Sequence, residues 1–181
     1  MAAKPIPQIV NARKELPVDF VRAILDYKPR SGLLIWKKRF DIAPLANSRV
    51  GKIAGFMASD GYIYVQINNK WYLAHRLAWV IMKGEWPKND IDHVRAPKTN
   101  NKWSNLREAT TQQNTRNTKK RASNTSKFKW VSWDKSKKCW VARIRDGKTH
   151  LNLGRYKTPE EGYAVACKAA KKLHGKFANY G

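Results

Sequence analysis

The chain has 181 residues, which allows one large domain or two or three small ones, and it carries 37 Lys and Arg against 13 Asp and Glu. A net charge of +24 is costly to hold together without a polyanionic partner, so it indicates nucleic acid, with an anionic membrane surface as the second possibility. No long amphipathic helix and no apolar run of roughly 18 residues is present, which argues against the membrane.

Two further features of the sequence indicate the compartment. The N-terminus lacks the apolar core of a secretion signal. The two cysteines, Cys139 and Cys167, are far apart and do not form a CxxC motif, so neither a disulfide framework nor a cysteine-ligated zinc site is expected. We therefore expect a protein of the reducing cytoplasm.

Residues 1–88 predict a small region of helix and β-hairpin. The apolar spacing in "PVDFVRAILDY" predicts a short helix that includes Leu25, and the apolar run in "SGLLIWKK" predicts a strand. Alternating residues around Asn68-Asn69 in "GYIYVQINNKWYLAH" predict a hairpin. The segment "HRLAWVIMKG" then predicts a helix that ends at Gly84.

Residues 89–118 predict the order strand, loop, strand, helix. Short strands at 91–94 and 106–108 flank a loop that is rich in asparagine. Thr110 or Thr111 can cap the helix that follows. Asp92 and His93 stand side by side in the first strand, where an ideal strand would point them to opposite faces.

The rest of the chain predicts a basic linker and a third module. Residues 119–126 form the linker, and residues 127–181 contain three strand-like runs, "FKWVSW", "CWVARIR" and "HLNLGRY". The final helix has a clear start, with Thr158 as the cap, Pro159 in the first turn and Glu161 three residues after the cap. The expected fold class is therefore α+β, with a three-stranded antiparallel sheet and one helix at the C-terminus.

The pair Asp92-His93 has the chemistry that phosphodiester hydrolysis needs. Histidine can take a proton from water near neutral pH, and a carboxylate with an amide oxygen suits a hard divalent cation. A lone Asp-His pair on a protein surface usually has no functional role. Its position before "SNLREAT" and before a helix that carries Asn114 makes the pair much more specific.

The segments "AHRLAWVIMKGEWP" and "IDHVRAPKTNNKWSNLREATTQQNTRN" resemble the HNH endonucleases, in the phage subgroup that includes homing endonucleases, and the likeness covers roughly residues 25–118. This resemblance implies a ββα-metal active site at 89–118. It implies His93 as the general base, Asp92 and Asn114 as ligands of Mg²⁺ or Mn²⁺, and Asn105 as the residue that pins the loop. His75 is typical of the subgroup without a settled role, and Asn117 is a further polar candidate. The loop "VRAPKTNNK" departs from the usual pattern.

Residues 127–181 resemble the AP2 DNA-binding domain, most closely in "WVARIR" and "LNLGRYKTPEEGYAVACKAAKKLHG". In that family the exposed sheet face enters the major groove of DNA. The resemblance implies a DNA-binding face formed by Lys129, Trp133, Arg143 and Arg145, with Arg155 nearby. The linker residues Lys119, Lys120 and Arg121 are expected to neutralise phosphates.

Taken together, these features predict a metal-dependent HNH endonuclease of the homing type that acts on double-stranded DNA. The expected protein is a monomer, with an oligomer left open, and needs no small-molecule cofactor. Removal of 127–181 should loosen sequence preference more than it slows the chemical step. The alternative is a DNA-binding regulator that keeps the nuclease fold without activity. An RNA-binding protein is a weaker hypothesis, because no aromatic RNA-binding signature is present.

Overall fold

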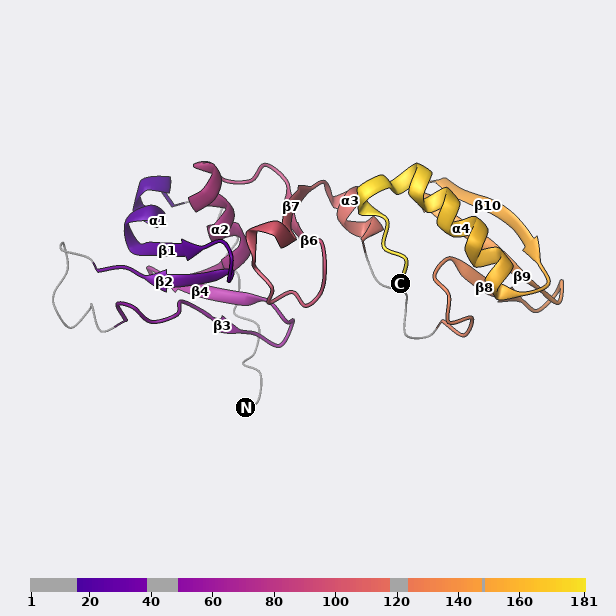
Figure 1. Ribbon diagram of the computed structural model, residues 1–181, viewed down its shortest axis with the longest axis horizontal. Helices are drawn as coiled ribbons and strands as arrows, with labels where there is room; N and C mark the ends of the chain where they lie inside the picture. The colour runs from indigo at the N-terminus through magenta and orange to yellow at the C-terminus, as the bar shows by residue number, and fades with distance from the viewer. Residues whose placement is uncertain (1–15, 39–48, 118–123, 148) are drawn as a thin grey trace. The chain divides into compact units, whose positions relative to one another are not determined.

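The structure is a computed structural model that divides into two compact units, Met1–Glu108 and Ala109–Gly181, each with its own hydrophobic core. Both units combine helices with small antiparallel sheets, so the fold class is α+β (Figure 1). The boundary falls inside the stretch 89–118 that the sequence predicts as one motif, while the predicted divisions at 88, 118 and 126 stay predictions. The structure describes residues 16–38, 49–117, 124–147 and 149–181.

The first unit begins with a helix that runs straight into a strand. Helix α1 (Val18–Ile24) is followed without a gap by β1 (Leu25–Lys28), which pairs antiparallel with β2 (Leu33–Trp36). The prediction that Leu25 is helical is wrong. The Leu25 backbone is extended, and this residue pairs with Trp36 in the sheet. The strand buries the Leu25 side chain, so its apolar character is equally compatible with a strand.

A second antiparallel sheet has the order β3 (Phe56–Met57), β4 (Ile63–Ile67) and β5 (Lys70–Leu73). The predicted hairpin is confirmed as β4 and β5. Its turn residues Asn68 and Asn69 have φ of 49° and 59°, the left-handed values that asparagine tolerates in a two-residue hairpin turn.

Helix α2 (Ala74–Lys83) follows β5 directly and confirms the prediction for this segment. It ends at Gly84, whose left-handed φ of 77° suits a residue without a side chain. One face of the helix is buried against α1, β4 and β5. The largest side chains of this core with almost no exposure are Val21, Leu25, Val65, Leu77 and Val80.

The two short strands that were predicted around the asparagine-rich loop are present. Strand β6 (Asp90–His93) pairs with β7 (Leu106–Ala109), and the short helix η2 (Trp103–Asn105) precedes β7. Ile91, Leu106 and Trp103 belong to the core of the first unit or pack against it. The loop between the strands therefore begins and ends on packed residues.

The second unit contains a short helix, a sheet and a long helix. Helix α3 (Thr111–Arg116) comes first, and the sheet has the order β10 (Thr149–Tyr156), β9 (Cys139–Asp146), β8 (Val131–Asp134). Helix α4 (Pro159–His174) packs on this sheet and is followed by η3 (Gly175–Phe177). The predicted start of α4 is confirmed, since Thr158 Oγ1 accepts from the Glu161 N–H. The resemblance to AP2 domains stays a prediction.

Strand register assigns the residues of this sheet to its two faces. Arg143 and Arg145 are exposed and share one face, and the pairing of Arg155 with Val141 places Arg155 on the same face. Trp133 pairs with Trp140, whose face carries the buried Ala142 against α4. The prediction that Trp133 lines the arginine face is therefore wrong, because the register of β8 turns it to the helix side.

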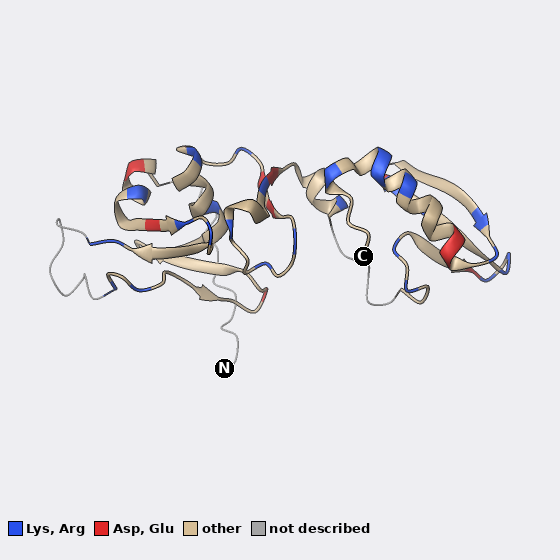
Figure 2. Ribbon diagram, in the orientation of Figure 1, with Lys and Arg blue, Asp and Glu red and all other residues tan. Residues whose placement is uncertain are grey.

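Basic residues occur in both units. Figure 2 shows Lys and Arg on the elements of the first unit and several along α4 of the second. Within the described ranges, no helix is both long and apolar enough to cross a bilayer.

Candidate active site

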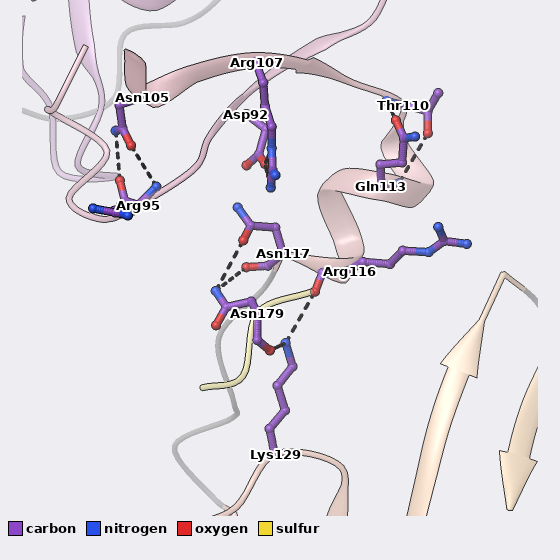
Figure 3. Close-up of polar contacts among 10 residues, drawn as sticks. All are labelled: Asp92, Arg95, Asn105, Arg107, Thr110, Gln113, Arg116, Asn117, Lys129 and Asn179. Carbon is purple, nitrogen blue, oxygen red and sulfur yellow. Dashed lines mark hydrogen bonds and ion pairs between the residues drawn. The ribbon is translucent and has the colours of Figure 1, made fainter. Parts of the chain in front are cut away.

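Asp92 and His93 use separate sets of partners although they are adjacent in β6. The Asp92 carboxylate accepts from Arg107 of β7 through a single oxygen: Oδ2 lies 2.9 Å from Nε and 2.7 Å from Nη2. Asp92 is buried and Arg107 is half-buried, with exposed side-chain fractions of 7% and 14%, and Figure 3 shows the two side chains together. The carboxylate is therefore held in one orientation by a buried ion pair.

The loop between β6 and β7 holds the His93 side chain. Its Nε2 lies 2.8 Å from Oδ1 of Asn101, and both side chains are buried. An amide oxygen can only accept, so Nε2 donates and carries the ring proton when the imidazole is neutral. The lone pair of the neutral ring is then on Nδ1, which is the atom that can take a proton.

A second histidine lies against this ring. The His75 ring in α2 meets the His93 ring edge to face, with centroids 5.0 Å apart, and the Tyr62 ring contacts both. The pKa of His75 is lowered to about 3, mainly by burial and to a smaller extent by the neighbouring His93 and Arg76. Burial also lowers the pKa of His93, which keeps its ring neutral, as a base must be near neutral pH.

Asn101 is fixed by residues far away in the sequence. The Tyr27 hydroxyl donates to its carbonyl oxygen at 2.7 Å. Gly32, with φ of 78°, approaches so closely that a Cβ there would lie 2.5 Å from the Asn101 carbonyl carbon. The neighbouring Trp103 N–H donates to the Pro29 carbonyl. The turn between β1 and β2 therefore shapes the loop that holds His93.

Asn105 ties the two ends of the loop together, which is the arrangement that the predicted loop role requires. Its Oδ1 accepts from the Arg95 N–H at 2.8 Å (Figure 3). Its Nδ2 donates to the carbonyls of Arg95 and Asn100 at 2.9 and 2.8 Å. Because Asn105 is buried, these bonds are shielded from competing water.

The remaining candidate of the motif, Asn114, lies on α3 in the second unit. This helix begins with a full capping box: Thr110 Oγ1 accepts from the Gln113 N–H, and Gln113 Oε1 accepts from the Thr110 N–H (Figure 3). Among the described residues, the half-buried Asn114 side chain has no hydrogen-bond partner.

The donors that could hold a cation are oxygen atoms. Among the described residues, no group of three or more His, Cys, Asp and Glu side chains could hold a metal. The Asp92 carboxylate is an oxygen donor of the kind that a hard cation such as Mg²⁺ prefers, and Mg²⁺ also keeps several waters and binds substrate phosphate. Arg107 on Oδ2 of Asp92 would compete with such a cation for that oxygen.

The predicted DNA-binding residues of the second unit have different surroundings. Arg143, Arg145 and Arg155 are exposed on the open sheet face. Lys129 precedes β8 and is buried, and its Nζ donates to the Asn179 carbonyl at 2.6 Å. The expectation that it lines the exposed face is therefore wrong, because main-chain oxygens hold it inside the unit. The linker residues Lys119, Lys120 and Arg121 lie outside the described residues.

Sequence reasoning missed two residues of the site, Arg107 and Asn101. Arg107 stands in the strand predicted to pair with the strand of Asp92, so a search for a cross-strand counter-charge could have found it. Asn101 is one of several asparagines in the loop, and the sequence has no signal that separates it from Asn100.

Comparison with known proteins agrees with this geometry. Residues 72–116 match the family model of the HNH endonucleases, so the chain carries an HNH endonuclease domain. Protein 3.8 of Escherichia phage T7 is 34% identical over 108 residues, which make up 59% of this chain and 88% of the relative. The chain belongs to the same family as this phage protein. No solved structure matches it.

Proposed function

We propose that the protein is a metal-dependent endonuclease of the homing type that hydrolyses phosphodiester bonds in double-stranded DNA. The observation that carries the proposal is the buried contact between His93 Nε2 and Asn101 Oδ1, within the region that matches the HNH endonuclease model. Such a contact would leave the lone pair of a neutral ring on Nδ1, as a general base requires, and the neighbouring Asp92 carboxylate is an oxygen donor suited to a divalent cation.

In this mechanism Nδ1 of His93 takes a proton from a water molecule as the water oxygen forms a bond to phosphorus. The bond from phosphorus to the 3′ oxygen breaks, and the leaving oxygen gains a proton from solvent. Asp92 and Asn114 would hold one Mg²⁺ or Mn²⁺, which would stabilise negative charge on the phosphate and the leaving oxygen. Asn105 keeps the loop closed, so that His93 stays oriented during the step.

The second unit would decide where the protein binds on DNA. Arg143, Arg145 and Arg155 present guanidinium groups on one open sheet face, which is suited to phosphates and to guanine edges. The linker residues Lys119, Lys120 and Arg121 would add phosphate contacts. In this proposal Lys129 and Trp133 make no contact with DNA.

The alternative is a DNA-binding regulator that has the nuclease fold without activity. The Asp92–Arg107 ion pair favours it, because a buried guanidinium already neutralises the expected metal ligand. A pair of this kind would let the site remain folded without a cation.

Plasmid nicking separates the two proposals. We expect cleavage with Mg²⁺ or Mn²⁺ and none with EDTA. His93→Ala should abolish cleavage and leave DNA affinity unchanged in a gel-shift assay. DNA binding without cleavage by the wild-type protein, whichever divalent cation is added, would establish the regulator. Cleavage retained by His93→Ala would remove this residue from the role of base.

A further inference from the structure

Helix α3, which carries Asn114, is too short to be stable by itself. It has six residues, none of them buried, and isolated helices of this length do not form in water. The capping box at Thr110 and Gln113 stabilises only its first turn. The last turn has carbonyl groups that need partners from elsewhere in the chain.

The C-terminal module supplies those partners. Nδ2 of Asn179 donates to the Asn117 carbonyl at 2.7 Å, and Nζ of Lys129 lies 3.4 Å from the Arg116 carbonyl (Figure 3). Lys129 Nζ also donates to the main-chain carbonyl of Asn179 at 2.6 Å, so the Lys129 side chain and residue Asn179 form one connected group. A buried ammonium at the end of a helix is also favourable for the helix dipole.

A third connection runs from the helix to the sheet. The Arg116 guanidinium pairs with the Asp146 carboxylate at the end of β9, and η3 packs against α3. These bonds join α3 to β9, to the segment before β8 and to the C-terminal segment. Because three separate segments hold its last turn, α3 is part of the C-terminal module in structure.

We propose that Lys129 and Asn179 are positioning residues for the nuclease reaction, which hold α3 and thereby set the orientation of Asn114. The inference rests on the proposed function, in which the Asn114 amide oxygen binds the catalytic cation. The module at 127–181 then has two tasks, DNA binding and the positioning of Asn114. We accordingly expect its removal to impair the chemical step as well as sequence preference.

The test uses the full chain and two variants that keep side-chain size, Lys129→Met and Asn179→Leu. The matched control is Lys137→Met, which also removes one positive charge but lies in the exposed turn between β8 and β9. Circular dichroism and thermal unfolding first verify that each variant is folded. Mn²⁺ affinity without DNA is then measured by calorimetry, and the Mn²⁺ concentration for half-maximal nicking is measured on plasmid.

We expect Lys129→Met to weaken Mn²⁺ binding about tenfold, the effect of one lost hydrogen bond to a charged group. Saturating Mn²⁺ should restore much of the nicking rate, and DNA affinity should match that of Lys137→Met. Unchanged Mn²⁺ affinity and unchanged half-saturation in both variants would overturn the inference.

Hydrogen exchange distinguishes failure of the inference on Lys129 and Asn179 from failure of the proposed function. The Asn114 N–H, bonded to the Thr110 carbonyl, should exchange faster in Lys129→Met and Asn179→Leu than in the control. If the wild-type protein neither binds Mn²⁺ nor nicks DNA, the proposed function fails, and with it the catalytic purpose of the contacts. Unchanged exchange in α3 would show that Lys129 and Asn179 do not hold the helix at all.

Discussion

Nε2 of His93 and Oδ1 of Asn101 lie 2.8 Å apart, and both side chains are buried. One belongs to the end of a strand and the other to the loop that follows it. The hydrogen bond determines both the ring orientation and the nitrogen that carries the proton. The proton-accepting atom of the proposed base is thus chosen by a residue that takes no part in the reaction.

Replacement of Asn101 by alanine should release the His93 ring from this tautomer. Nitrogen-15 spectra of labelled histidine should show the proton on Nε2 in the wild-type protein and a mixture of tautomers in Asn101→Ala. The nicking rate should fall about tenfold, the cost of one lost buried hydrogen bond. Asn100→Ala is the control and should keep the wild-type spectrum, and an unaltered His93 signal in Asn101→Ala would refute the assignment.

Loss of Arg107 should destabilise the first unit. Arg107→Met leaves the buried Asp92 carboxylate without its counter-charge, so the free energy of unfolding should fall by about 3 kcal/mol in urea titrations. The double variant Arg107→Met with Asp92→Asn should recover most of this loss, because no lone buried charge remains. Equal destabilisation by the single and double variants would mean that the charge pair is not responsible.

Arg107→Met also tests whether Arg107 and a divalent cation compete for the Asp92 carboxylate. Mg²⁺ should raise the melting temperature of Arg107→Met more than that of the wild-type protein, since the cation then neutralises the carboxylate alone. EDTA should remove the difference. Equal shifts in the two proteins would indicate that the cation does not bind at Asp92.

Gly32 and Gly51 allow a matched pair of substitutions. Both have left-handed φ, 78° and 76°, so alanine costs about 1–2 kcal/mol of backbone strain at either position. A Cβ at Gly32 also meets the main chain of Asn101 and Lys102 at 2.5 Å, whereas nothing lies within 4 Å at Gly51. Gly32→Ala should therefore lower the free energy of unfolding by about 1–3 kcal/mol more than Gly51→Ala. Equal losses would show that the loop moves aside without cost.

The buried His75 should make stability depend on pH. Its pKa of about 3 in the folded chain lies below the ordinary 6.5, so between these values the unfolded chain binds a proton that the folded chain does not. Stability should therefore fall as pH drops below about 6.5, with a slope of up to about 1.4 kcal/mol per pH unit from this group.

The slope between pH 6.5 and 5 can be compared among three proteins in urea titrations. His75→Gln should make it less steep, since one titrating group is gone while His93 and His174, whose pKa values burial also lowers, remain. His150→Gln should leave it unchanged, because this histidine is exposed in β10. If the free energy of unfolding depends on pH as steeply in His75→Gln as in the wild-type protein, the pH dependence comes from other groups.

Local elements could be predicted from the sequence because their causes are local. The Asn68-Asn69 turn, the stop of α2 at Gly84 and the cap of α3 at Thr110 each depend on residues within a few positions. Leu25 was assigned to the wrong element, because apolar spacing cannot tell a helix end from a strand that is buried at the same place.

Relations between distant segments could not be predicted. The burial of Lys129 depends on a carbonyl at Asn179, and the side of the sheet that Trp133 occupies depends on its pairing with Trp140. The residues of the site were found from one motif, but the groups that orient them, Arg107 and Asn101, follow from packing. Short-range patterns contain no information on such contacts.

The hydrogen bond from Tyr27 to Asn101 also bears on how this HNH domain can be transferred between proteins. The family model matches residues 72–116, and this match taken alone indicates a segment that can be transferred as a unit. A chimaera built from that segment alone would leave behind Tyr27, Gly32 and Pro29, whose contacts shape the loop around His93. Recombination that keeps the catalytic loop intact must therefore also carry the β1–β2 turn.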